Sequence, residues 1–126
     1  MIHLDTNILI ALTKADSTAR AWLTAQSKLG EEFCVSSITW YEFLVGPVLS
    51  HQIQDIEIIL DSAPIPFDTT LAEKSAKYFN KTGRARKRKT DTMIAATAIL
   101  HGGKLATRNI VDFKLFEPLG LTLIEV

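Results

Sequence analysis

The 126-residue chain is predicted to form an α/β fold, in which helices flank a central parallel sheet of four or five short strands. Three observations predict it. Short apolar runs alternate with longer segments whose apolar residues recur at helical spacing, which is the pattern of βαβ units. The hydrophobic fraction is 47%, with only 6 glycines and 4 prolines, so the chain can build a core. No linker, repeat or low-complexity tract interrupts it, and we expect one domain over residues 1–126.

Six elements are expected in the first half of the chain. They are, in order, a strand over residues 1–4, a helix over residues 5–14, a helix over residues 16–30, a strand over residues 32–37, a helix over residues 38–46 and a helix over residues 48–62. Gly30 and Gly46 stand where two of these helices should stop. The apolar face of the second helix is formed by Ala19, Trp22, Leu23 and Leu29. An amphipathic stripe in the last helix is formed by Leu49, Ile53, Ile56 and Leu60.

The second half continues the alternation. It is expected to contain a strand over residues 64–67, a helix over residues 68–83, a helix over residues 90–103, a strand over residues 104–107, a helical turn over residues 109–116 and a strand over residues 121–126. Pro64 and Pro66 favour a sheet edge or a strand start, because proline has no N–H to donate. The helix over residues 90–103 is apolar nearly all round, which is typical of a central, buried helix.

Composition limits the location of the protein. No apolar run approaches the roughly 20 residues that span a bilayer, and the N-terminus lacks the features of an export signal. A single cysteine, Cys34, cannot form an internal disulfide and is expected to be buried in the apolar stretch "FCVSS". We therefore expect a cytoplasmic protein without a membrane segment.

The net charge of zero conceals a segregation of charge. A basic strip over residues 84–89, "RARKRK", holds five of the 14 basic side chains, which leaves 9 basic against 14 acidic residues elsewhere. Its members are Arg84, Arg86, Lys87, Arg88 and Lys89. Such a strip can bind a polyanion through its phosphates, although runs of this kind also occur as solvated loops.

Polar side chains follow the predicted strands, at the edge where open α/β sheets bind ligands. They are Asp5, Asn7, Glu42, Asp91, Thr107, Asn109 and Asp112, with Asp68 as an additional candidate. Each has a structural alternative. Asp5, Asp68 and Asp91 could be helix caps or first-turn acids, Thr39 with Glu42 fits a capping box, Asp112 could be a solvated turn acid and Asn7 could cap its own helix.

Capping does not explain why three or four carboxylates should gather at one end of a sheet, where they repel one another. Protons or divalent cations can offset that repulsion. The candidates are all oxygen donors, because His3, His51 and His101 are isolated and His3 suits a packed strand position. Oxygen ligands favour Mg²⁺, or Mn²⁺, and such ions activate water for the hydrolysis of phosphodiesters. Glu42 or Asp91 could orient that water.

At these residues the sequence resembles PIN-domain ribonucleases, specifically the VapC-type toxins of VapBC toxin–antitoxin systems. The resemblance covers nearly the whole chain and rests on "HLDTNILIAL", "SSITWYEFLVG", "TDTMIAATAILHGGKLATRNIVDF" and "LGLTLIEV". It implies a PIN-like sandwich, a Mg²⁺-dependent endoribonuclease, a homodimer and a cognate VapB-type antitoxin. It assigns the metal-binding acids to Asp5, Glu42, Asp91 and Asp112, with Asn7, Thr107 and Asn109 as polar supports. Two features depart from the family pattern, namely Thr92 after Asp91 and the dense basic strip.

Other functions remain open from the sequence. A haloacid-dehalogenase-like phosphatase also begins with a strand and an aspartate, but it needs a second Asp where this chain has Asn7. A catalytically silent PIN-type module that binds nucleic acid or regulates a partner would share the fold, although the complete acid set argues against it. Trp40, Tyr41 and Phe79 could stack on bases or pack in a core or dimer interface.

Overall fold

A computed structural model describes all of residues 1–126 and confirms the predicted α/β fold. Four strands form one parallel sheet in the order β2-β1-β3-β4. The strands are β1 (Ile2–Leu4), β2 (Phe33–Cys34), β3 (Lys104–Thr107) and β4 (Thr122–Glu125). The inner strand β1 is buried along its whole length, as expected for a parallel strand covered on both faces.

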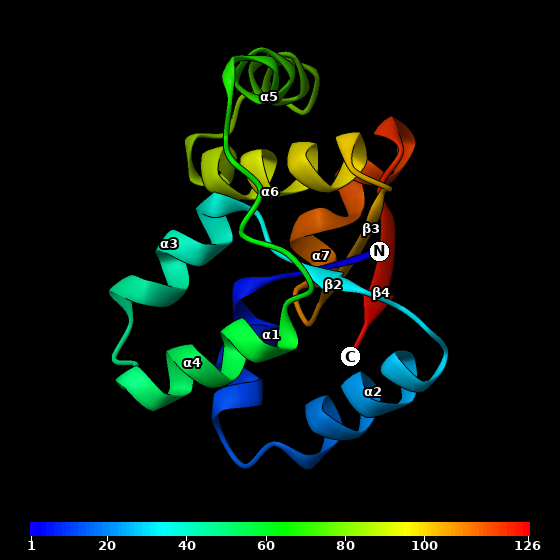
Figure 1. The fold of residues 1–126 in the computed structure, drawn as a ribbon. Helices are drawn as coiled ribbons and strands as arrows, with labels where there is room; N and C mark the ends of the chain where they lie inside the picture. Colours follow the sequence, from blue (N-terminus) through cyan, green and yellow to red (C-terminus); the bar gives the residue numbers. More distant parts are fainter.

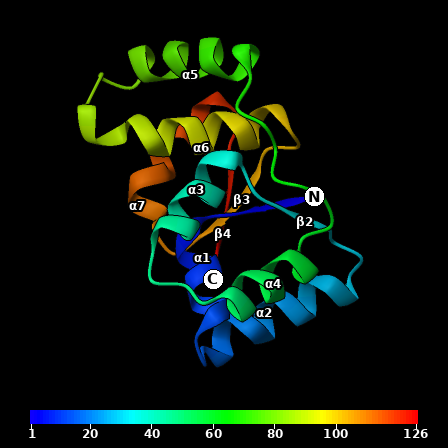
Figure 2. The ribbon, with the colours of Figure 1, turned by 60° about the vertical axis from the view of Figure 1, so that its left-hand side comes forward.

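Helices cover both faces of the sheet (Figure 1). The α-helices are α1 (Thr6–Thr13), α2 (Ser17–Lys28), α3 (Ser37–Val45), α4 (Ser50–Ile59), α5 (Thr69–Lys81), α6 (Lys89–Leu100) and α7 (Ile110–Phe113). Short 3₁₀ turns precede α6 at Arg86–Arg88 and follow α7 at Lys114–Leu119. One layer contains α1, α2 and α4; on the other side α6 packs on the sheet, and α5 lies outside α6 (Figure 2).

The core divides along these layers. A cluster that includes Ile8, Leu9 and Phe43 joins the sheet to α1 and α3, while a second, including Ile94 and Phe113, joins it to α6 and α7. The central position predicted for residues 90–103 is confirmed, because α6 lies between the sheet and α5 and half of its twelve residues are buried. Side chains therefore pack on both faces of β1 and β3, the two inner strands at whose ends the candidate site lies.

The strand expected over residues 64–67 is the main error of the sequence-based prediction. Ile65 forms one isolated parallel bridge with Ser36, through hydrogen bonds of 2.9 Å to Val35 and Ser37, and no strand develops. The reason is that Pro64 and Pro66 flank Ile65 and have no N–H to extend the ladder.

Two residues assigned to apolar helix faces are exposed. Leu29 is 77% exposed because α2 ends at Lys28 and Leu29 is the C-cap. Leu49 is the N-cap of α4 and is also exposed, whereas Ile53, Ile56 and Leu60 pack against the core. Apolar periodicity thus located both helices, but it assigned to each apolar face one residue that lies just outside the helix.

Burial of Cys34 leads to a prediction about its reactivity. The side chain is fully buried on β2, and this burial raises the pKa of the thiol to about 12. Because only the thiolate reacts, we expect modification by a disulfide reagent at pH 8 to be slower by orders of magnitude in the native than in the unfolded protein. Absorbance of the released thiol measures both rates, and similar rates would contradict this burial.

None of the helices combines the length and the hydropathy that a segment spanning a bilayer requires.

Candidate active site

Asp5 stands where β1 ends and α1 begins. Its N–H donates to the Ala106 carbonyl at 3.0 Å, which continues the β1–β3 ladder by one residue. The carboxylate is buried; Oδ1 accepts from the Thr6 N–H at 2.8 Å and Oδ2 from the Thr107 hydroxyl at 2.7 Å. Burial raises the pKa of Asp5, and these two hydrogen bonds act in the opposite direction. Asp5 therefore caps α1 and is also a desolvated carboxylate at the sheet edge.

Thr107 is the hydrogen-bonding centre of this edge. Its hydroxyl is completely buried, donates to Asp5, and accepts from the Asn109 N–H at 2.9 Å. The Asn7 amide lies 3.4 Å from the same oxygen, and the Arg108 N–H donates to Asn7 Oδ1 at 3.3 Å. Of the three polar residues proposed as supports, Thr107 therefore bonds to Asp5 directly, while Asn7 and Asn109 bond to Thr107 and fix the loop after β3.

Glu42 approaches Asp5 from α3. Its Oε1 accepts from the Thr6 hydroxyl at 2.7 Å, which joins the start of α1 to the second half of α3. The capping box suggested by Thr39 and Glu42 does not form, because Ser36 is the N-cap and its hydroxyl accepts from the Thr39 N–H at 2.9 Å. Glu42 is thus directed toward the site. Thr6 was not among the predicted site residues, although its place directly after Asp5 was a usable signal.

Asp91 completes the cluster from α6. The helix begins two residues earlier, at Lys89, and no side chain caps it, so Asp91 is not the N-cap but an acid in the first turn, as the second structural alternative expected. The pKa of Asp91 is raised to about 6, first by burial and then by the negative charges of Asp5, Asp112 and Glu42. The charges of Asp5, Asp112 and Glu42 therefore act on Asp91 across the site, which the capping alternative for Asp91 does not explain.

Asp112 lies at the rim of the same site. It is exposed on α7, and its Oδ2 accepts from the Asn109 amide at 2.6 Å.

Asp68, in contrast, is the N-cap of α5 and accepts from the Leu71 N–H at 2.9 Å, so the capping explanation is confirmed for it. His3 is a packed strand residue, with Nε2 bonded at 2.8 Å to the His101 carbonyl.

The chemistry of these donors fits a hard divalent cation. None of the three ion pairs in the structure involves Asp5, Glu42, Asp91 or Asp112, so no protein cation offsets their charge. No group of three His, Cys, Asp or Glu side chains is arranged tightly enough to hold a metal ion by itself. The fit rests on the donor type alone, because carboxylate oxygens are the ligands that Mg²⁺ prefers and one or two of them commonly hold it together with water.

An ion pair that the sequence analysis missed borders the site. Arg108 follows Thr107 directly, and its Nη1 donates to Asp16 Oδ2 at 2.7 Å. This hydrogen bond lowers the pKa of Asp16 to about 2. The guanidinium of Arg108 is therefore paired with Asp16, the N-cap of α2, and forms no ion pair with the four acids of the site.

The basic strip lies immediately before Asp91, over the 3₁₀ turn and the start of α6. The Arg84 guanidinium contacts the Asn80 side chain and lies 6.0 Å from the centre of the Phe79 ring, and Arg88 donates to the Thr82 carbonyl at 3.2 Å. The remaining three, Arg86, Lys87 and Lys89, are exposed. None of the five forms an ion pair with an acidic residue. The strip therefore presents unneutralised positive charge beside the acidic site.

The Thr92 departure has a local explanation. Its buried hydroxyl donates to the Arg88 carbonyl at 2.6 Å, one turn back in the chain.

Of the three aromatic residues considered for base stacking, Trp40 packs against Phe43 with ring centres 5.6 Å apart, whereas Tyr41 is exposed and Phe79 lines a groove.

A parallel sheet whose strand ends gather acids from β1, α3, α6 and α7 matches one known class of protein. The family model of the PIN domain matches residues 2–114, and the chain belongs to the PIN-domain family.

Within this family the chain is similar to VapC ribonucleases. It is 32% identical to VapC ribonuclease Y4jK of Sinorhizobium fredii, over 99% of this chain and 96% of that protein. It is 30% identical to ribonuclease VapC10 of Mycobacterium tuberculosis, over 94% of this chain and 90% of that one. A chain of FitAB bound to a DNA fragment superposes with a TM-score of 0.77 at 26% identity, covering 99% and 94% of the two chains. A toxin–antitoxin complex from Klebsiella pneumoniae gives 0.69 at 32% identity, covering 90% of each.

Proposed function

We propose that this protein is a Mg²⁺-dependent endoribonuclease and the toxin of a toxin–antitoxin pair. The observation that carries the proposal is the convergence of Asp5, Glu42, Asp91 and Asp112 without a protein cation to neutralise them. The names of the VapC relatives support RNA as the substrate. A divalent cation bound by these carboxylates would supply Lewis-acid activation of water and stabilise charge on the phosphate.

The chain's own residues have distinct parts in this proposal. Asp5 and Asp91, the two acids that burial affects most, would hold the ion, and the Thr107 and Thr6 hydrogen bonds keep Asp5 oriented toward it. Glu42 uses Oε1 to accept from Thr6, which leaves Oε2 to accept a hydrogen bond from the attacking water. Asp112, oriented by Asn109, adds negative charge at the rim.

A cleavage assay tests the proposal. Labelled single-stranded RNA is incubated with the protein in Mg²⁺, in Mn²⁺, or with a chelator, and DNA of the same sequence is the control. We expect endonucleolytic cleavage of RNA that the chelator abolishes and added Mg²⁺ restores. Binding without cleavage in either ion would favour the silent PIN-type module, and release of phosphate from monoesters would favour a phosphatase.

The basic strip is proposed to hold the RNA backbone. Replacing Arg86, Lys87 and Lys89, the exposed members whose side chains make no hydrogen bond, with Gln should weaken binding and flatten its salt dependence. Each lost phosphate contact lowers the log–log slope by roughly 0.7, so the three together lower it by about 2. Fluorescence anisotropy at several salt concentrations measures the slope. The matched control replaces Lys14, Arg20 and Lys28, exposed cations on the α1–α2 side. An unchanged slope in the strip variant would show a solvated loop.

We also propose that the protein forms a homodimer through exposed apolar side chains of α3 and α4. Val45, Leu49 and Ile58 are all exposed there, and Ile58 is 82% accessible. Ile58→Asp should shift the protein from dimer to monomer, because a charge in an apolar interface is not solvated. Sedimentation at micromolar concentration measures this, with Leu29→Asp on α2 as the matched control. A wild-type protein that sediments only as a monomer would contradict the proposal.

A VapB-type antitoxin is the proposed protein partner. The solved structures similar to this chain include a toxin–antitoxin complex, which supports the proposal. Co-expression with the product of a candidate VapB-type antitoxin gene should yield a stable complex with reduced RNA cleavage. Unaltered cleavage in the presence of that product would argue against it as the antitoxin.

A further inference from the structure

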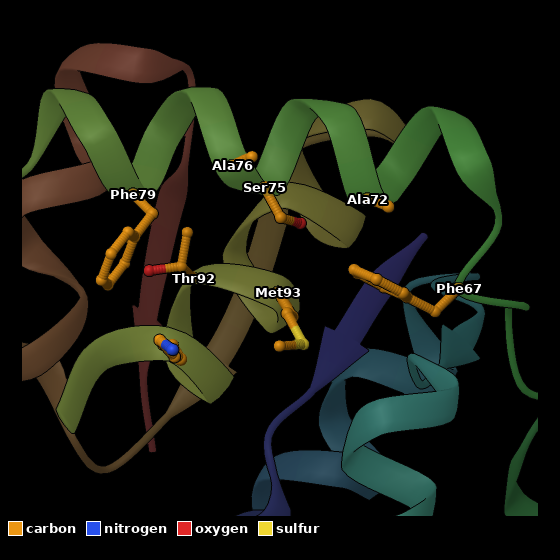
Figure 3. Close-up of a pocket in the computed structure, with 8 residues that line it drawn as sticks. Phe67, Ala72, Ser75, Ala76, Phe79, Thr92 and Met93 are labelled. Carbon is orange, nitrogen blue, oxygen red and sulfur yellow. The ribbon is translucent and has the colours of Figure 1, made fainter. Parts of the chain in front are cut away.

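A groove between α5 and α6 is not used by the acidic site. It has a volume of about 230 Å³ and is lined mainly by apolar side chains of the two helices. Figure 3 shows Phe67 and Phe79 at its two ends, with Ser75 and Met93 between them. On α5 the lining residues Ala72 and Ala76 are exposed, so the groove opens to solvent.

A polar group inside the groove has no partner in the chain. The Ser75 side chain points between the two helices toward Met93, and the residue is only 6% exposed (Figure 3). Its hydroxyl makes no hydrogen bond. A buried hydroxyl without a partner costs free energy, so its presence is more readily explained by a ligand that bonds to it.

Both the first and the last residue of the basic strip border the same groove. Lys89, the last residue of the strip, lines the groove, and Arg84, the first, lies over the ring of Phe79. An apolar slot with aromatic ends and a cationic border matches the two parts of a nucleotide. The base stacks on aromatic rings, while the phosphate binds the cations.

We propose that the α5–α6 groove is a subsite for one unpaired base of the RNA, with the Ser75 hydroxyl bonding to the edge of that base. This rests on the proposed ribonuclease function and extends it to substrate selection. Thr92 and Met93, which line the groove, follow Asp91 on α6. Because successive residues of a helix are rotated by about 100°, Asp91 faces a different side of α6 from the groove. The RNA would pass over the basic strip at the start of α6, so the bound base belongs to a nucleotide beside the cleaved bond.

Binding without cleavage tests the subsite. The background is Asp91→Asn in the presence of chelator, and the probes are a labelled single-stranded RNA and an abasic ribose-phosphate oligomer of the same length. The groove is filled by Ala72→Trp, and the matched control is Ala25→Trp on an exposed position of α2. We expect Ala72→Trp to weaken RNA binding roughly tenfold, the scale of one stacked base, and to leave abasic binding unchanged.

Ser75→Ala tests the polar contact separately. Because the hydroxyl has no partner in the chain, this variant should melt no lower than the parent protein. Its affinities for oligomers of A, C, G and U should differ less from one another than those of the parent.

The outcomes separate this subsite from the proposed function. If neither RNA nor the abasic oligomer binds, RNA recognition as a whole fails and the subsite fails with it. If the two bind equally and Ala72→Trp changes neither affinity, the RNA proposal stands and the base subsite is wrong. A change in sedimentation with unchanged RNA affinity would overturn the subsite by placing a second copy of the chain on the groove.

Discussion

Asp91→Asn should abolish RNA cleavage while the protein remains folded. Asparagine keeps the size of the side chain, and Asp91 is a first-turn acid of α6 and not its N-cap, so the fold should lose at most about 1 kcal/mol of helix-dipole stabilisation. A hard cation depends on the charge of Asp91, because the amide removes a negative ligand from the cluster. We expect cleavage to fall at least about 100-fold, the scale on which losing one charge-stabilising group acts.

The same variant should be more stable than the wild type when no metal is present. The pKa of Asp91 is raised from 3.8 to about 6, so the folded state binds the proton more tightly than the unfolded state. Wild-type stability therefore falls as the pH rises through this range, and the variant lacks that loss. Its advantage should be absent below pH 3.8 and complete above about pH 6. Thermal melts in chelator across this range measure it.

Asp68→Asn is the matched control for this experiment. Asp68 is a true N-cap, and asparagine caps a helix about as well, so melting and cleavage should both stay near wild type. Near-wild-type cleavage by a folded Asp91→Asn protein would falsify the metal-binding role of Asp91.

Thr107→Val should damage both stability and activity. Valine has the same shape, but it leaves Asp5 Oδ2 and the Asn109 N–H without their partner. Losing a buried bond to a charged group and a second bond to a backbone N–H should cost about 2–3 kcal/mol. For a chain of this size that lowers Tm by about 10 °C. Cleavage should fall about 10- to 100-fold, because Thr107 positions Asp5 and Asp5 is the proposed ligand.

Thr97→Val separates that effect from the general cost of removing a buried hydroxyl. Thr97 is as deeply buried as Thr107, but it donates only to the Met93 carbonyl within α6. Its replacement should leave cleavage unchanged and Tm within a few degrees. Equal cleavage by the Thr97 and Thr107 variants would show that Thr107 has no special role at the site.

Much of the fold followed from local patterns in the chain. Apolar spacing, helix caps and stop glycines located the helices, and the short runs "MIHL" and "KLAT" identified the two strands that lie inside the sheet. These predictions succeeded because a helix or a buried strand requires its periodicity within the segment itself. The prediction of a strand over residues 64–67 was wrong. The stretch is as apolar as a strand, but the prolines on either side of Ile65 lack the N–H groups that would extend the single bridge.

The sequence by itself determined the fold class and which acids follow the strands, because strand ends and helix starts are local features. Only the tertiary structure decided what each acid does there. Asp68 and Asp91 occupy similar places near helix starts, yet Asp68 caps its helix and Asp91 is repelled by three other carboxylates. The same holds for Glu42, which bonds to Thr6, 36 positions away, and forms no capping box. A carboxylate's role depends on its desolvation and on neighbouring charges, and these come from chain segments that only folding brings together.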